Sequence, residues 1–182
     1  MNKCVSILNF SPRNSGNCGT ISEFIANYHS GDECKIFHIG AKVFGPCEGC
    51  DLECLKMGVS CPKLQDQERQ IMDQLLASDL VYFVVPNFCG YPSASYFAFN
   101  ERTVGYFNMD REKMGRYMAV QKRFVVVSNT EGFEAVMTQQ AKDPKILYLK
   151  TRKYHRNSIA GDLMDCEEAR NDLLRYLEQF EV

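Results

Sequence analysis

The sequence carries no excess of charge of either sign. Its 182 residues contain 21 Lys and Arg against 23 Asp and Glu, which gives a formal net charge of -2. Such a balance provides no bulk attraction to nucleic acid or to an anionic membrane surface. The chain also has no apolar run near the roughly 20 residues that a membrane-spanning helix requires. We therefore expect neither nucleic acid nor a membrane as a partner.

A signal peptide, internal repeats and low-complexity segments are missing as well. The chain begins Met1-Asn2-Lys3-Cys4 and passes straight into an apolar run. This is not a signal-peptide pattern, so we expect a cytoplasmic protein. The hydrophobic fraction of 45% is ordinary for a globular protein. Because nothing in the composition divides the chain, residues 1–182 are expected to form a single domain.

Apolar runs and helical periods alternate along the chain. Extended or continuous apolar runs predict strands at residues 3–10, 33–39, 79–85, 123–128 and 145–149. Apolar residues at helical spacing predict helices at residues 18–28, 64–77, 93–106, 133–140 and 165–180. Residues 108–120 are charged and Met-rich, without a clear period. The alternation predicts an α/β fold with a three-layer, doubly wound parallel sheet of five strands.

The turn after the first predicted strand, Ser11–Cys18, has the composition of a phosphate site. Hydroxyl and amide side chains, a glycine and Arg13 precede a predicted helix. The first backbone N–H groups of a helix lack partners within it and lie at the positive end of its dipole. The alternative interpretation is an ordinary helix start capped by Ser15 or Asn17.

Loops that follow strands one, three and four of a doubly wound sheet meet at its carboxyl edge, where ligands bind. All three loops have the composition of ligand loops here. They are Ser11–Cys18, Pro86–Pro92 and Asn129–Gly132.

Two motifs stand in order along the first part of the chain. The first is Phe10-Ser11-Pro12-Arg13 followed by Gly16-Asn17-Cys18. The second is Pro86-Asn87-Phe88-Cys89-Gly90 followed by Ser93-Ala94, Phe99 and Glu101-Arg102. Together they resemble the flavodoxin-like NAD(P)H-dependent FMN reductase family. The resemblance covers the chain from the first predicted strand to the loop after the fourth, and it implies a flavodoxin-like sheet with strand order 2-1-3-4-5.

The resemblance also implies which residues bind FMN. In the family the first loop holds the FMN phosphate and the second lines the isoalloxazine ring. The residues implied at the phosphate are Ser11, Arg13, Ser15, Gly16, Asn17 and Cys18. Those implied at the ring are Pro86, Asn87, Phe88, Cys89 and Gly90. The third loop matches more loosely, through Asn129, Thr130 and Gly132.

The function implied by this resemblance is that of an FMN-dependent NAD(P)H oxidoreductase. Electrons pass from a nicotinamide cofactor, or from a protein donor, through FMN to a small-molecule or protein acceptor. Because the flavin does the redox work, no acid–base catalytic residue is expected. The resemblance further implies a homodimer or higher homo-oligomer. Phe10, Cys18 and Phe97 depart from the family pattern. Two alternatives stay open, a flavodoxin-type electron carrier and a cofactor-less binding module with the same fold.

Nine cysteines are the unusual count in this composition. In a cytosolic chain they are expected to be reduced, so a cluster suggests a metal or redox site rather than disulfides. Cys47, Cys50, Cys54 and Cys61 form such a cluster before the second predicted helix. A subset of the family, the iron–sulfur flavoproteins, has a compact four-cysteine run at this place, which implies a [4Fe–4S] cluster on these thiolates. Structural Zn²⁺ and an empty cysteine-rich loop are the alternatives.

Overall fold

The computed structural model describes residues 2–40, 45–47, 49–56, 58–59, 61–62 and 67–179. The parallel strands are β1 (Cys4–Asn9), β2 (Glu33–His38), β3 (Leu80–Phe88), β5 (Gln121–Val127) and β6 (Lys145–Leu149). The helices are α1 (Asn17–Tyr28), α2 (Gln67–Ala77), α3 (Ala94–Phe107), α4 (Arg111–Ala119), α5 (Glu134–Met137) and α6 (Glu167–Glu178). Two short 3₁₀ turns are η1 (Glu53–Leu55) and η2 (Leu163–Asp165).

The strand order across the sheet is β2-β1-β3-β5-β6. When only the parallel strands are counted, this is the order 2-1-3-4-5 that the resemblance implies. The prediction of a five-stranded sheet is incomplete, because a sixth strand, β4 (Tyr91–Pro92), pairs antiparallel with the end of β3. The predicted third strand ended at Val85, whereas β3 continues to Phe88. Its last residues stay extended because β4 gives Asn87 and Phe88 cross-strand partners.

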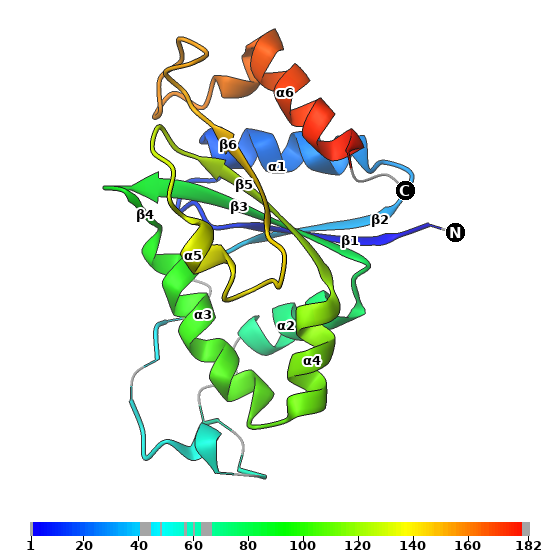
Figure 1. The fold of residues 1–182 in the computed structure, drawn as a ribbon, viewed down its shortest axis with the longest axis vertical. Helices are drawn as coiled ribbons and strands as arrows, with labels where there is room; N and C mark the ends of the chain where they lie inside the picture. The colour runs from blue at the N-terminus through cyan, green and yellow to red at the C-terminus, as the bar shows by residue number, and fades with distance from the viewer. Residues whose placement is uncertain are drawn as a thin grey trace.

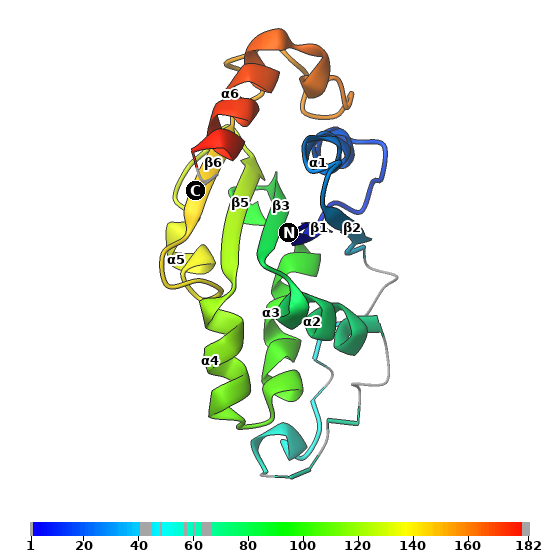
Figure 2. The same ribbon diagram turned by 90° about the vertical axis from the view of Figure 1, so that its right-hand side faces the viewer.

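Helices cover both faces of the sheet. Alternate side chains along a strand point to opposite faces, so on β3 the residues Tyr82 and Val84 pack in the core beneath α1 and α6. Val81 and Phe83 pack in the second core, beneath α2, α3 and α4. Figures 1 and 2 show these two helical layers on either side of the sheet. Because β3 is buried on both faces, its residues 80–85 form a continuous apolar run in the sequence.

Phe10, a departure from the family pattern, belongs to the core. Its side chain is fully buried, and its ring lies 5.6 Å from that of Phe83 and 5.2 Å from that of Tyr96. Its carbonyl accepts hydrogen bonds from the hydroxyls of Ser93 and Ser95, each at 2.9 Å. The loop after β1 therefore leaves the sheet from a point that is fixed to the start of α3.

Several element boundaries differ from the sequence prediction. Residues 108–120 contain α4, whose start is capped by the Asp110 carboxylate accepting from the Lys113 N–H. The helix predicted at 133–140 is the single turn α5. Residues 64–66 of the predicted second helix, and Phe180 at the end of the last one, lie outside the described residues.

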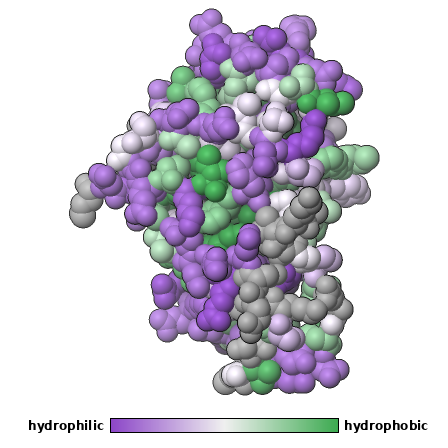
Figure 3. Space-filling view, turned by 180° about the vertical axis from the view of Figure 1, so that it is seen from behind, coloured by the Kyte–Doolittle hydropathy of each residue, from purple (hydrophilic) through white to green (hydrophobic). Residues whose placement is uncertain are grey.

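Hydrophilic side chains spread over most of the face seen in Figure 3, with apolar ones between them in small groups. In the described part of the chain, no helix combines the length and the apolarity needed to cross a bilayer.

Candidate functional site

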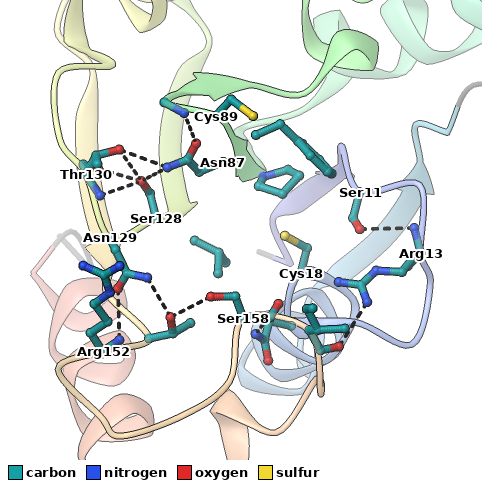
Figure 4. Close-up of a pocket in the computed structure, with 17 residues that line it drawn as sticks. Ser11, Arg13, Cys18, Asn87, Cys89, Ser128, Asn129, Thr130, Arg152 and Ser158 are labelled. Atoms are coloured by element: carbon teal, nitrogen blue, oxygen red, sulfur yellow. Dashed lines mark hydrogen bonds between the residues drawn. The ribbon is translucent and has the colours of Figure 1, made fainter.

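A cavity of about 380 Å³ lies at the carboxyl edge of the parallel sheet, within the size range of ligand pockets. Segments that follow β1, β3, β5 and β6 form its walls (Figure 4). The three loops singled out in the sequence do converge here. Of the residues implied at FMN, those lining the cavity are Ser11, Arg13, Asn17, Cys18, Pro86, Asn87, Phe88, Cys89, Gly90, Asn129 and Thr130. Ser15, Gly16 and Gly132 are not among the lining residues.

The loop after β1 folds tightly against the first turn of α1. The Ser11 hydroxyl accepts from the Arg13 N–H at 3.2 Å, and the Ser11 N–H donates to the Asn9 side chain at 2.9 Å. A Cβ placed on Gly19 would lie 1.7 Å from the Asn14 carbonyl oxygen. Only glycine therefore permits this close approach of loop and helix, and Gly19 is a residue that the sequence analysis missed.

Neither Ser15 nor Asn17 caps α1, so that prediction is wrong. The N-cap position is Gly16, and no side chain bonds there. Asn17 lies inside the helix, where its side-chain oxygen accepts from the Leu163 N–H at 3.0 Å. Its amide nitrogen donates to the carbonyls of Asn157 and Ser158, at 3.3 and 3.4 Å. The Asn17 side chain thus ties α1 to residues 157–158 and to the start of η2.

Residues 157–161, which we name the strap, lie against the loop after β1. The Arg13 guanidinium donates to the Ile159 carbonyl at 3.1 Å. Gly161 has a φ of +79°, and a Cβ there would lie 2.6 Å from the Ser15 carbonyl oxygen. A positive φ and this close contact both favour glycine. The strap therefore orients Arg13 at the edge of the cavity.

The opposite wall is a two-residue hairpin. Cys89 and Gly90 connect β3 to β4 with φ values of +54° and +87°, as in the tight turns that match strand twist. The Asn87 side-chain oxygen accepts from the Gly90 N–H at 2.7 Å. Its amide nitrogen donates to the hydroxyls of Ser128 and Thr130, at 2.7 and 2.9 Å. Asn87 thus joins two of the predicted ligand loops (Figure 4).

The charge of the cavity wall is one-sided. Among the described residues Arg13 and Arg152 line it, whereas no Asp or Glu does. Polar groups on the rest of the wall are amides and hydroxyls, chiefly those of Asn129, Thr130 and Ser158. The wall therefore attracts anions, although the whole chain has a net charge of -2.

The two thiols of the cavity differ in environment. Cys18 is 3% exposed, and this burial raises the pKa of its thiol from 9.0 to about 12, although Arg13 acts in the opposite direction. Cys18 is therefore a neutral packing residue, not a thiolate. Cys89, at the hairpin, is exposed.

The sequence analysis did not assign the wall residues that follow β5 and β6. These are Ser128, Thr151, Arg152, Ser158 and Ile159, to which Val127 at the end of β5 is added. Thr151 and Arg152 come directly after β6, so the rule that ligands bind at the carboxyl ends of strands was the available signal.

The four-cysteine loop lies elsewhere, beside the second half of α3 (Figure 1). All four thiol residues line one small cavity of about 30 Å³, together with Glu101, Arg102 and Gly105. The Glu101 carboxylate accepts from the Cys47 N–H at 3.3 Å, and the Arg102 guanidinium donates to the Gly45 carbonyl at 3.3 Å. A Cβ on Gly105 would lie 3.0 Å from Cys61. The four cysteines that the sequence analysis singled out therefore lie around one small cavity.

The arrangement of these thiols does not fit a metal cluster. Across the described residues, no group of three or more His, Cys, Asp or Glu side chains is placed to hold a metal ion. The cavity of about 30 Å³ has room for about two water molecules. A hydrogen bond with the Glu53 carboxylate also raises the pKa of the Cys50 thiol, which opposes the thiolate form that iron and zinc require. The [4Fe–4S] ligand set is therefore not supported.

Several solved structures share this fold. The Trp repressor binding protein from Bacillus subtilis matches with a TM-score of 0.62 at 12% identity, over 98% of this chain and 99% of its own. A protein named as a quinone reductase from Klebsiella pneumoniae matches with a TM-score of 0.65 at 13% identity, over 98% of this chain and 86% of its own. The chain has the flavodoxin-like fold.

An NADH:FMN oxidoreductase in its apo form is similar as well, with a TM-score of 0.52 at 9% identity, over 98% of this chain and 90% of the other. No protein-family model and no curated protein sequence matches the chain. At these identities the likeness establishes the fold that the sequence resemblance implied.

Proposed function

We propose that this chain is an FMN-dependent NAD(P)H oxidoreductase, which passes electrons from a nicotinamide cofactor through bound FMN to an acceptor. The observation that carries the proposal is the cavity at the carboxyl edge of the sheet. In the part of the chain that the structure describes, it is lined by two arginines, by amides and hydroxyls, and by no carboxylate. The names of two structures with the same fold, a quinone reductase and an NADH:FMN oxidoreductase, support it.

The chain's own residues supply binding and orientation. The Arg13 guanidinium, the Ser11 hydroxyl and the unpaired N–H groups at the start of α1 would hold the FMN phosphate. Pro86, the Cys89–Gly90 hairpin and Thr130 would line the ring. Bound FMN would supply the redox chemistry, as an acceptor of hydride and a donor of electrons. The proposal assigns no acid–base role to the chain, because the flavin supplies the redox chemistry.

An anaerobic absorption titration with FMN, followed by NADH or NADPH, tests the proposal. We expect FMN to bind at micromolar concentration or below and the bound flavin to be bleached by the nicotinamide. Slow reduction by both nicotinamides with fast reduction by a ferredoxin-type protein would indicate a flavodoxin-type carrier instead. A protein that binds no FMN would contradict the proposal and leave a cofactor-less binding module.

We propose that the four-cysteine loop takes no part in this electron path, because its described residues include no group placed to hold a metal ion. Iron and zinc assays on the same anaerobic sample test that exclusion, since a four-thiolate cluster requires about four irons per chain. On the family resemblance we also propose a homodimer or higher homo-oligomer, which light scattering of the purified protein checks.

A further inference from the structure

The run after β6 contains four cations, and three of them are neutralised by carboxylates. The Lys150 ammonium lies 2.5 Å from the Glu131 carboxylate. The Lys153 ammonium lies 2.5 Å from Asp172 and 3.4 Å from Glu168. The Arg156 guanidinium lies 3.7 Å from Asp162. The fourth cation, Arg152, has no acidic partner within the part of the chain that the structure describes.

The backbone of Arg152 is held firmly. Its N–H donates to the Asn129 side-chain oxygen at 3.0 Å, and the Asn129 amide nitrogen donates to the Thr151 hydroxyl at 3.0 Å. The Thr151 hydroxyl lies 3.0 Å from that of Ser158 in the strap. Arg152 therefore starts from a fixed point between the ends of β5 and β6, and its side chain lines the cavity.

Arg152 and Arg13 lie on opposite sides of the cavity (Figure 4). They follow β6 and β1, which are separated in the sheet by β3 and β5. Three strand spacings amount to about 14 Å between their starting points. Arg13 is in addition directed to the Ile159 carbonyl of the strap. One phosphate held by Arg13 would therefore leave the charge of Arg152 for a second anion.

We propose that Arg152 binds a phosphate group of the nicotinamide donor while Arg13 holds the phosphate of FMN. This inference rests on the proposed function. Among the described residues this guanidinium has no acidic partner and its cavity no lining carboxylate, so it matches phosphate oxygens by charge and by its planar, bidentate geometry. Both the pyrophosphate, present in NADH and NADPH, and the 2′-phosphate of NADPH have this chemistry.

The test compares Arg152→Gln with Arg156→Gln, which removes the same charge from the same run but at a paired residue away from the cavity wall. The rate of reduction of bound FMN is measured against donor concentration. The donors are NADH, NADPH and 1-benzyl-1,4-dihydronicotinamide, a hydride donor without phosphate. FMN affinity and urea unfolding are measured for each variant to establish that the site and the fold persist.

For Arg152→Gln we expect a tenfold or larger rise in the donor concentration at half-maximal rate, with the maximal rate and the FMN affinity within twofold of wild type. A rise for both nucleotides assigns the pyrophosphate, and a rise for NADPH alone assigns the 2′-phosphate. The benzyl donor should be unaffected, and Arg156→Gln should behave as wild type with all donors.

Two outcomes overturn the inference alone, with FMN bound and reduced normally. One is an Arg152→Gln variant that matches Arg156→Gln with both nucleotides. The other is an equal loss with the benzyl donor, which would indicate a general effect on the site. Failure of the wild type to bind FMN would overturn the proposed function and this inference together.

Discussion

The pocket at the carboxyl edge of the sheet and the four-cysteine loop differ in how their side chains are held. In the pocket, side chains begin at strand ends whose register is set by the sheet, and bonds such as Asn87 to Ser128 join neighbouring loops. The described residues of the cysteine loop contain only the short turn η1 and rest on α3 through Glu101, Arg102 and Gly105. The pocket side chains are thus fixed by the sheet, whereas the cysteine side chains depend on contacts with a single helix.

The largest expected effect comes from the support of the cysteine loop. Arg102 and Glu68 form an ion pair at 2.9 Å, with both side chains at 5% exposure or less. Glu68→Ala leaves the guanidinium buried without that carboxylate, so we expect the free energy of unfolding to fall by about 3–5 kcal/mol. Urea unfolding measures it.

The matched control for that variant is Glu23→Ala, at an exposed position of α1 away from the cysteine loop, where we expect a loss below about 1 kcal/mol. Faster labelling of Cys61 in Glu68→Ala would show that the cysteine loop has loosened. Equal stability of the two variants would mean that this ion pair does not hold the loop to the helices.

The second prediction concerns FMN binding at the pocket. Gly19→Ala forces its Cβ toward the Asn14 carbonyl, 1.7 Å away in the present geometry, so the loop after β1 must move. We expect FMN affinity to fall at least tenfold, or about 1.4 kcal/mol, as measured by flavin fluorescence titration. Gly31→Ala, where a Cβ meets nothing within 4 Å, is the control and should bind FMN as wild type does. If Gly19→Ala binds FMN with normal affinity, the loop after β1 is not part of the FMN site.

The sequence predicted the layers of the fold well because a strand buried on both faces is apolar at every position, as in residues 80–85 and 124–127. It also predicted most of the pocket wall, since ligand loops follow parallel strands. It could not predict the role of Asn17, whose partners stand 140 or more residues away. Nor could it predict that Lys153 is paired with a carboxylate while Arg152 is not, because the Asp172 partner of Lys153 is brought there by the packing of α6.

Arg13→Ala tests the same loop at a single charge, with an expected effect of the same order as that of Gly19→Ala. Removal of a charge-assisted phosphate contact is expected to weaken FMN binding by roughly 1.5–3 kcal/mol. Calorimetric titration with FMN measures it, with Arg111→Ala on the exposed start of α4 as the control. Unchanged affinity in Arg13→Ala would count against the phosphate position beside this loop.

The smallest effect concerns Cys18 and pH. Its pKa rises from 9.0 to about 12 on folding, so the unfolded chain loses this proton first as the pH rises. The protonated, buried Cys18 thiol therefore makes its full contribution to the free energy of unfolding below pH 9, and this contribution is lost as the pH rises from 9 to 12. Between pH 7.5 and 9.5 we expect wild type to lose about 0.8 kcal/mol more stability than Cys18→Ala, measured by urea unfolding. If the free energy of unfolding falls equally with pH in the two proteins, the Cys18 thiol is not buried from water and its pKa is not raised.

The most direct test of the proposed FMN site is hydrogen exchange of the backbone amides, followed by mass spectrometry with and without FMN. We expect FMN to slow exchange in residues 13–18, 86–90 and 129–132, and to leave residues 45–47 and 49–56 of the cysteine loop unchanged. Protection of the cysteine loop, or of neither region at a concentration where FMN is bound, would contradict the assignment of the pocket at the sheet edge as the flavin site.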